Sequence, residues 1–313
     1  MTDLLDRVRS TGLLAPGAAV VVLLSGGRDS VCLLDVATRI AGADDVVALH
    51  VNHGLRGEES EGDEAHCRAL AAALGVELVV DRSGPAPPTG NLQAWARDHR
   101  LGPAARLATA RGAQVATGHT MSDQAETILY RLAASPGRRA LLGMQARDGL
   151  LVRPLLHVGR DETAAHCRAR GLAWREDSSN ASDSYTRTRV REGLVPALRA
   201  LHPAAERNVA RTAELLREEG EVLDELVATV LDGRDHVGTE HLAVLPPALA
   251  RLVVRRLAED AAGRLCPRAP GRLAELLTLR DGAIDVGDGV RAVVSGGELH
   301  MERTPPLGGR ESE

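Results

Sequence analysis

The segment Ala19–Ser30, AVVVLLSGGRDS, is the part of this 313-residue chain that most strongly indicates its architecture. The apolar run 19–24 is typical of a fully buried parallel strand, and the apolar positions over 31–40 follow the period of a helix. Ser30 is a candidate N-cap for that helix. Backbone N–H groups of a glycine turn and of a helix N-terminus attract phosphate. The sequence therefore predicts a nucleotide-binding turn made of Ser25, Gly26, Gly27, Arg28, Asp29 and Ser30.

Two common nucleotide-binding loops are excluded by the residues of this turn. A Walker A loop requires a lysine after its last glycine, and all 38 basic residues of the chain are arginine. A dinucleotide-binding fingerprint requires a third glycine where Leu33 and Leu34 stand. The turn that remains resembles the SGGxDS loop of the ATP pyrophosphatase (PP-loop) superfamily. The resemblance implies an adenine nucleotide alpha hydrolase-like fold that transfers AMP to an oxygen of the substrate and releases pyrophosphate.

Alternation of apolar and helical segments predicts the fold class. Apolar segments lie at 46–51, 76–80, 113–117 and near 150–152, and helical patterns lie at 30–41, 60–74, 91–111 and 122–134. Strands and helices in this order predict an α/β fold with a doubly wound parallel sheet. Gly102 and Pro103 are expected to break or kink the third helix.

A second, mostly helical domain is expected after about residue 200, because the chain exceeds the usual domain length of about 100–200 residues. A long amphipathic helix is predicted from Pro203 to about Leu231, followed by helices near 246–260 and 268–280 and a small β-meander over 284–303. The expected parts are a catalytic domain over 1–200, a substrate-binding domain over 201–303 and a disordered tail over 304–313.

Composition and charge narrow the class of protein. The four cysteines lie far apart without a CxxC pair, so a structural zinc or iron–sulfur site is not expected. The chain has no signal pattern and no apolar run of about 18 residues, so we expect a cytoplasmic protein with no membrane partner. The net charge of −5 is uneven, since residues 131–212 hold fifteen arginines against eight acidic residues. This stretch suits a nucleic-acid backbone and, equally, a solvated surface.

Two further segments carry candidate site residues. GHTMSDQAET over 118–127 follows a predicted strand and opens a predicted helix, and its Asp123 and Glu126 project from one helical face. This is where ligands bind in α/β sheets, although a capping box also explains such residues. HVNHGLRG over 50–57 leaves the second strand, and we place its His53 and Arg56 in the nucleotide site. His50 is expected to pack at the strand end.

Six segments in order resemble the tRNA(Ile)-lysidine synthase family. They are SGGRDS (25–30), HVNHGLRG (50–57), GHTMSDQAET (118–127), RPLL (153–156), WREDSSN (174–180) and YTRTRVREGLVPAL (185–198). Sibling pyrophosphatases share the first segment, whereas the last two are much more particular to this family. The resemblance covers about residues 20–200, and the remainder is similar to the short form of the family, with a helical, tRNA-binding second domain.

The resemblance implies a reaction with two steps. ATP adenylates the C2 carbonyl oxygen of the wobble cytidine of tRNA(Ile) with a CAU anticodon, and free L-lysine then displaces AMP to give lysidine. ATP and Mg²⁺ are the implied cofactors, with Asp29 helping to hold Mg²⁺ at the phosphates. Asp123 and Glu126 match the acidic pair of the family. One of them would hold the lysine ammonium, and the other would accept its proton or coordinate Mg²⁺.

Arginines complete the set of implied site residues. Arg187, Arg189 and Arg191 match an arginine element of the family that would bind RNA phosphate. We place Arg191 against the charge that develops as AMP transfers, so it joins Asp29, Asp123 and Glu126 as a candidate catalytic residue. The structural alternative for the three arginines is an alternating pattern on a solvated helix start.

The chain departs from the family pattern at three positions. Thr120 and Ser122 stand where the family has a histidine and an acidic residue, and Thr188 replaces an asparagine. Two other functions therefore stay open, namely a PP-loop tRNA thiolase and a catalytically inactive tRNA- or nucleotide-binding homologue. The scattered cysteines disfavour the thiolase, and the intact acidic residues disfavour the inactive homologue. A homodimer is left open as well.

Overall fold

The computed structural model describes residues 3–54, 57–82, 92–135, 137–175 and 188–304, with 92–100 described by their backbone alone. Arg56 and Arg187 therefore lie outside the described residues, as does the predicted tail beyond residue 304. The chain divides into two compact units, Met1–Leu216 and Arg217–Glu313. None of the described helices combines the length and the hydropathy needed to cross a membrane.

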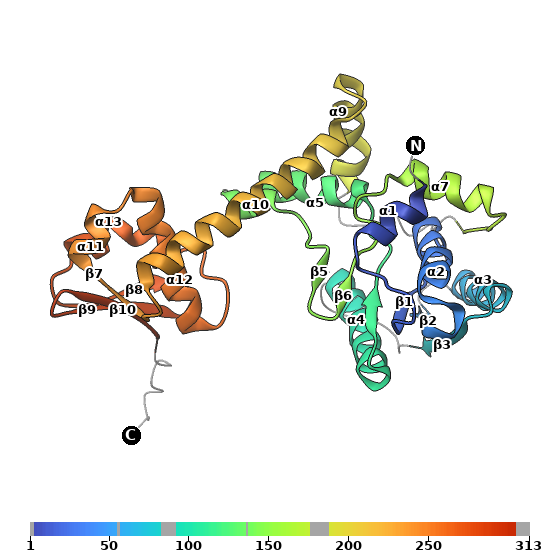
Figure 1. The fold of residues 1–313 in the computed structure, drawn as a ribbon, viewed down its shortest axis with the longest axis horizontal. Coiled ribbons are helices and arrows are strands. Elements are labelled where there is room, and N and C mark those ends of the chain that lie inside the picture. The colour runs from blue at the N-terminus through green and yellow to red at the C-terminus, as the bar shows by residue number, and fades with distance from the viewer. Residues whose placement is uncertain (1–2, 55–56, 83–91, 136, 176–187, 305–313) are drawn as a thin grey trace. The chain divides into compact units, whose positions relative to one another are not determined.

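The first unit alternates strands and helices, as predicted (Figure 1). Its strands are β1 (Val20–Leu23), β2 (Val46–Asn52), β3 (Glu77–Arg82), β4 (Gln114–Ala116), β5 (Arg147–Asp148) and β6 (Leu151–Val152). Its helices are α1 (Leu4–Ser10), α2 (Arg28–Ala41), η1 (Ala43–Asp45), α3 (Glu58–Leu74), α4 (Leu92–Arg111), α5 (Met121–Ala134), α6 (Arg138–Leu141), α7 (Arg160–Ala169), the π-helical turn η3 (Val190–Leu194), α9 (Val195–Leu201) and the first part of α10 (Ala205–Leu231).

The sheet of the first unit has the order β3-β2-β1-β4-β6-β5. All pairs are parallel except β5 with β6, which forms an antiparallel edge. The chain runs outward from β1 to β3 on one side and continues with β4 on the other side, so the winding reverses between β1 and β4. The crevice at the carboxyl ends of two such strands is the usual ligand site of an open α/β sheet.

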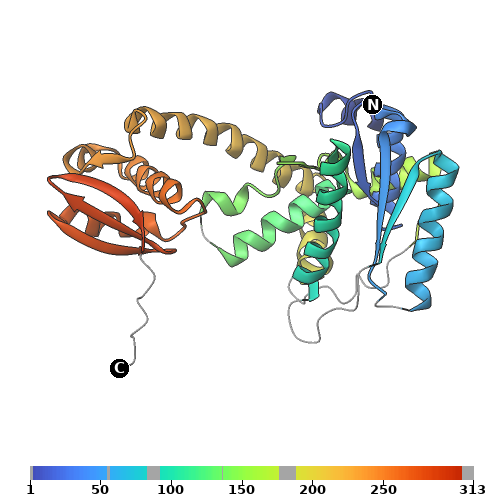
Figure 2. The same cartoon turned by 90° about the horizontal axis from the view of Figure 1, so that it is seen from below.

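Side chains of β1 enter two cores, one on each face of the sheet. Val20 and Val22 pack with residues of α2 and α3, whereas Val21 packs with Ala104 and Ala108 of α4. Figure 2 shows α3 and α4 on opposite sides of the strands. Burial of both faces explains why the strand is continuously apolar, and it confirms the doubly wound parallel sheet.

One local prediction in this unit is wrong, and of a second, that Gly102 and Pro103 break or kink the third helix, the break is wrong. Helix α2 begins at Arg28 with Gly27 as its N-cap, so Ser30 lies inside the first turn, where its hydroxyl donates to the Gly27 carbonyl at 2.8 Å. Helix α4 continues through Pro103 without the expected break. Ala104 and Ala108 behind this proline are fully buried against the sheet, and that packing offsets the lost backbone hydrogen bond.

The second unit has its own core and a small antiparallel sheet. Its elements are the end of α10, β7 (His236–Gly238), α11 (Thr239–Val244), α12 (Pro247–Ala262), η4 (Ala269–Arg272), α13 (Leu273–Thr278), β8 (Gly282–Gly287), β9 (Val290–Ser295) and β10 (Glu298–Arg303). The predicted meander is present as β8–β10, and the unpredicted β7 joins it in the order β7-β10-β9-β8. Val253 and Leu257 of α12 pack on Leu299 of β10 within one buried cluster.

Candidate functional site

The turn between β1 and α2 is closed by its own hydroxyl groups. Ser25 N–H donates to Ser30 Oγ at 3.2 Å, and Gly27 N–H donates to Ser25 Oγ at 3.3 Å. Gly26 adopts φ +86°, a conformation that side chains other than glycine rarely take. The turn thus gathers backbone N–H groups and two hydroxyls at the N-terminus of α2, an arrangement that favours phosphate.

The segment before α5 lies directly against this turn. A Cβ added to Gly118 would come within 3.0 Å of the Asp29 backbone carbonyl group and 3.1 Å of the Ser30 nitrogen. Only glycine allows this approach without a shift of the backbone. The two polar segments that the sequence singles out therefore meet between β1 and β4, where the sheet reverses its winding.

Asp123 has both a capping and an electrostatic role. Its Oδ2 accepts from the backbone N–H of Thr120 at 2.8 Å and from the Thr120 hydroxyl at 2.7 Å, which caps α5. Its Oδ1 accepts from Arg160 at 3.1 Å. Burial alone would raise the pKa of Asp123, but the Arg160 charge and the Thr120 hydrogen bonds outweigh it and lower this pKa. Asp123 is therefore held ionised.

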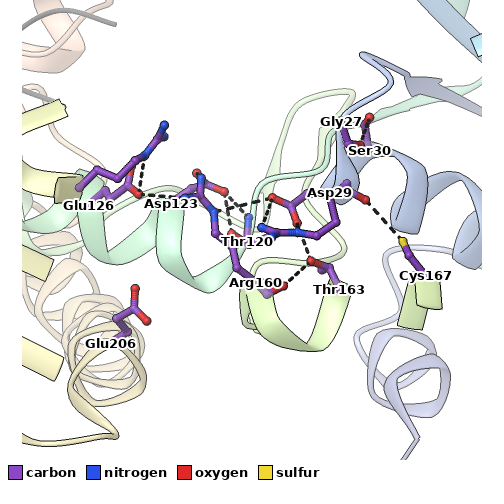
Figure 3. Close-up of polar contacts among 12 residues, drawn as sticks. Gly27, Asp29, Ser30, Thr120, Asp123, Glu126, Arg160, Thr163, Cys167 and Glu206 are labelled. Atoms are coloured by element: carbon purple, nitrogen blue, oxygen red, sulfur yellow. Dashed lines mark hydrogen bonds and ion pairs between the residues drawn. The ribbon is translucent and has the colours of Figure 1, made fainter. Parts of the chain in front are cut away.

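Asp29 lies in the first turn of α2 and faces α7 (Figure 3). Its Oδ1 accepts from the Thr163 hydroxyl at 2.5 Å and from Arg28 Nε at 3.1 Å. Arg28, predicted as a phosphate ligand, thus pairs with the neighbouring carboxylate in this structure. Both contacts fix the carboxylate beside the phosphate-binding turn.

Glu126 is 3% exposed and pairs with Arg191 through both carboxylate oxygens. Arg191 Nε donates to Oε1 at 3.0 Å and its terminal nitrogen donates to Oε2 at 3.1 Å. Arg191 lies in the π-helical turn η3, a rare geometry that occurs frequently at functional sites. The structure therefore brings Arg191 to Glu126 across a long separation in sequence.

Arg160, which the sequence analysis missed, connects these carboxylates. Its guanidinium lies 3.8 Å from Asp29, 3.1 Å from Asp123 and 3.6 Å from Glu126. Arg160 is the first residue of α7, and Figure 3 shows it between Asp123 of α5 and Asp29 of α2. The available signal was an arginine at a helix start shortly after the RPLL segment, but nothing in that spacing names its partners.

The remaining predicted residues are less well defined by contacts. His53 follows β2 and is half-buried. Arg189 is exposed, and its predicted contact with RNA phosphate stays a prediction. His50 is buried with its Nδ1 2.9 Å from the Leu24 carbonyl, consistent with a packing role.

The donor set suits Mg²⁺ bound partly through phosphates. Within the described ranges, no three or more His, Cys, Asp and Glu side chains are grouped to hold a metal ion by themselves. Asp29 and Asp123 nevertheless lie within 4 Å of the same guanidinium, so two carboxylates are available beside the turn. Mg²⁺ is usually held by one or two carboxylates and by substrate phosphates, which fits these residues.

A separate hollow of about 310 Å³ lies beside the start of α5. Its walls carry positively charged arginines and negatively charged glutamates. Asp29, Asp123 and Glu126 are not among its lining residues. The lining residues are Arg7, Met121, His157, Glu162, Arg207, Ala210, Arg211 and Glu214. This hollow is therefore distinct from the acidic site.

Comparisons with known proteins show the family of this chain. Residues 5–198 match the PP-loop domain family. The chain is 40% identical to a tRNA(Ile)-lysidine synthase of Salinispora tropica, over 90% of this chain and 89% of that protein. It is 37% identical to the enzyme of that name from Symbiobacterium thermophilum, over 99% and 71%, and 40% identical to that of Thermus thermophilus, over 92% and 57%.

A solved structure shares the fold. The U34-tRNA thiolase NcsA from Methanococcus maripaludis superimposes with a TM-score of 0.59 over 68% of this chain and 78% of that chain, at 20% identity. Several relatives are longer than this chain, which spans less than two thirds of the Thermus thermophilus protein.

Proposed function

Since this chain belongs to the tRNA(Ile)-lysidine synthases, a family with a PP-loop domain, we propose that it ligates free L-lysine to a tRNA at the expense of ATP. The acceptor is C2 of the wobble cytidine of tRNA(Ile) with a CAU anticodon, and the products are lysidine, AMP and pyrophosphate. Nothing in this proposal requires more than one chain at the site. The four free cysteines fit a reducing cytoplasm.

One observation carries the proposal. Three carboxylates, those of Asp29, Asp123 and Glu126, meet around one guanidinium beside a phosphate-binding turn. A reaction that joins a nucleotide to a cationic amine needs this combination, because phosphate is bound by N–H groups and an ammonium is bound by carboxylates. A purely nucleotide-binding module would have no use for the buried acid at position 126.

In the first step, the C2 oxygen of the cytidine attacks the α-phosphorus of ATP, and the bond to the leaving pyrophosphate breaks. The turn over residues 25–30 is placed to bind the phosphates at the N-terminus of α2, where the N–H groups of the first helical turn have no acceptor within the helix. Arg191 is available to stabilise negative charge that develops on the transferring phosphate, once its pair with Glu126 opens. Mg²⁺, held by Asp29 at the phosphates, would neutralise charge on the leaving group.

In the second step, the ε-nitrogen of lysine attacks C2, and the bond from C2 to the oxygen of AMP breaks. Free lysine has a pKa of about 10.4, so its ammonium must lose a proton before the attack. Asp123 is held ionised and accepts a hydrogen bond from the Thr120 N–H. Its negative charge suits it to bind the ammonium. Glu126, buried between two arginines, is then the group placed to accept the proton.

The thiolase alternative is less well supported by the cysteines. All four are free and fully buried, and Cys67 lies beside His50 under the β1 strand end. Burial raises the pKa of the Cys67 thiol to about 12, which suppresses the reactive thiolate. A thiol that delivers sulfur has to reach the substrate, and all four thiols are shielded from solvent in this structure.

The proposal is tested with transcripts of tRNA(Ile) that carry the CAU anticodon. We expect ATP–pyrophosphate exchange that depends on this transcript, and incorporation of labelled lysine into the RNA. A transcript with uridine at the wobble position is the matched control, and it should support neither reaction. Pyrophosphate release without lysine in the RNA would refute the lysidine assignment and point to another acceptor.

A further inference from the structure

Arg160 has more carboxylate neighbours than it can bind well. Its three nitrogens each face a different acid, with Asp123 at 3.1 Å, Glu126 at 3.6 Å and Asp29 at 3.8 Å. Only the first contact is a hydrogen bond, since the other two exceed the distance that such a bond allows. The Nε atom is buried and lacks a hydrogen-bond acceptor. The guanidinium therefore lies centrally among three anions without being locked to all of them.

The other two arginines of the site are held differently. Arg191 forms two hydrogen bonds to Glu126, at 3.0 and 3.1 Å, and Arg28 donates to Asp29 at 3.1 Å. Bidentate pairs of this kind are strong and geometrically specific. Arg160 differs from the other two arginines because it shares its charge among three carboxylates and has a hydrogen bond to one of them.

The position of Arg160 on its own helix also disfavours a positive charge. It is the first residue of α7, whose N-terminal end already carries the positive pole of the helix dipole. The acidic residues Asp161 and Glu162 in the same turn compensate the positive pole of the helix dipole. Glu162 also caps the helix, because its Oε2 accepts from the Gly159 N–H at 2.9 Å. The carboxylates across the site, and not the helix, therefore hold the guanidinium in place.

We propose that Arg160 is a positioning residue that acts as an exchangeable counter-ion, occupying in the free enzyme the place that cationic ligands take during the reaction. The inference rests on the proposed function and deepens it. The guanidinium offsets the repulsion between Asp29, Asp123 and Glu126, and it leaves when Mg²⁺ binds to Asp29 and Asp123 or when an ammonium binds to Asp123 and Glu126. Each cationic ligand consequently has to displace the guanidinium of Arg160 from the carboxylates, and this competition weakens the binding of the ligand.

Thermal unfolding in the absence of ATP, tRNA and lysine tests this exchange. Wild type, Arg160→Ala and Arg160→Gln are titrated with Mg²⁺ at constant ionic strength. Without Mg²⁺ both variants should unfold at lower temperature than wild type, because three carboxylates lose their shared cation. With Mg²⁺ their stability should recover, with a titration midpoint about tenfold lower than that of wild type, equivalent to about 1.4 kcal/mol.

Arg160→Lys separates charge from shape, and Arg170→Ala is the matched control. The lysine variant retains a positive charge, so its midpoint should stay within about threefold of wild type. Arg170 is the C-cap of the same helix and pairs with the buried Asp35, remote from the turn, so its removal should lower stability without changing the Mg²⁺ midpoint.

Equal midpoints in wild type, Arg160→Ala and Arg160→Gln would overturn the proposal and leave Arg160 a structural link. A shift of the same size in Arg170→Ala would overturn it as well, because the effect would then reflect general loss of stability. The experiment needs no turnover, so failure of the lysidine assignment would show separately, as absent lysine incorporation by the wild-type enzyme. In the exchange assay, the Mg²⁺ concentration for half-maximal rate should fall in Arg160→Gln alongside the midpoint.

Discussion

Glu126 is almost fully buried, yet both of its oxygens are bound by Arg191. The pair uses one lone pair on each oxygen, so a proton from an amine goes to a remaining lone pair or replaces an arginine contact. The acid at this position was predictable, because its spacing from Asp123 places both on one helical face. Its partner was not, since a contact between residues 126 and 191 depends on how distant segments pack.

Replacing Glu126 with glutamine should separate the two steps of the reaction. Glutamine can still accept a hydrogen bond from Arg191 but cannot take a proton, so lysine incorporation should fall by about 10²–10⁴-fold. ATP–pyrophosphate exchange with the CAU transcript should remain within about threefold of wild type, less than 1 kcal/mol. Glu192→Gln, an exposed acid next to Arg191, should change neither rate. Wild-type lysine incorporation by Glu126→Gln would remove this residue from proton transfer.

At the level of elements, the close contact between the β4–α5 segment and the start of α2 determines the site. Strand and helix positions were predictable from hydrophobic periodicity, and the predicted doubly wound sheet implies a reversal, which the structure places between β1 and β4. The N-cap of α2 was not predictable. Ser30 is a residue type that often caps helices, but here its hydroxyl donates to the carbonyl of Gly27. Short elements such as β7 carry too few residues to show a period.

Gly118→Ala should damage this contact directly. The added methyl group would lie 3.0 Å from the Asp29 backbone, which has no flexible end that can move aside. We expect a loss of about 1–3 kcal/mol in the free energy of unfolding, as for other overpacked sites, together with weaker ATP binding. Gly271→Ala, where no atom lies within 4 Å of the added carbon, is the control for urea denaturation and for ATP titration. Unchanged ATP affinity in Gly118→Ala would mean that this approach is not needed for the site.

Helix α3 is joined to the sheet by a buried carboxylate with a distinct pH signature. Hydrogen bonds from Arg82, Asn52 and Arg68 lower the pKa of Glu64 from its ordinary 4.5 to about 2. A lowered carboxyl pKa contributes stability above 4.5 that is lost as the pH falls toward about 2. Glu64→Gln should therefore be less stable than wild type at pH 7, and the difference should shrink between pH 4.5 and 2. Urea denaturation across this range measures it; a constant difference would contradict the assignment.

At the scale of the molecule, the described residues form three buried clusters, two in the first compact unit and one in the second. A second domain was predictable from length and from the change of pattern after residue 200. The structural boundary falls inside α10, near residue 216, because a continuous helix gives no break in its periodicity at which to place a boundary.

Independent cores predict independent losses of stability. Leu299→Ala in β10 should cost about 2–5 kcal/mol in the second unit while ATP binding stays within about threefold of wild type. Leu155→Ala in the first core should instead lower the temperature of the unfolding transition that ATP raises. Differential scanning calorimetry with and without ATP distinguishes the two. A single transition lowered equally by both variants would show that the units unfold together.

The burial of all four thiols makes this chain a convenient background for site-specific labelling. Cys32, Cys67, Cys167 and Cys266 are each fully shielded from solvent, so maleimide reagents meet no native cysteine on the folded surface. One cysteine introduced at an exposed position, such as Leu201 at 82% exposure, would be the only fast-reacting group. A fluorophore attached there would report on tRNA docking without first removing any cysteine from the protein.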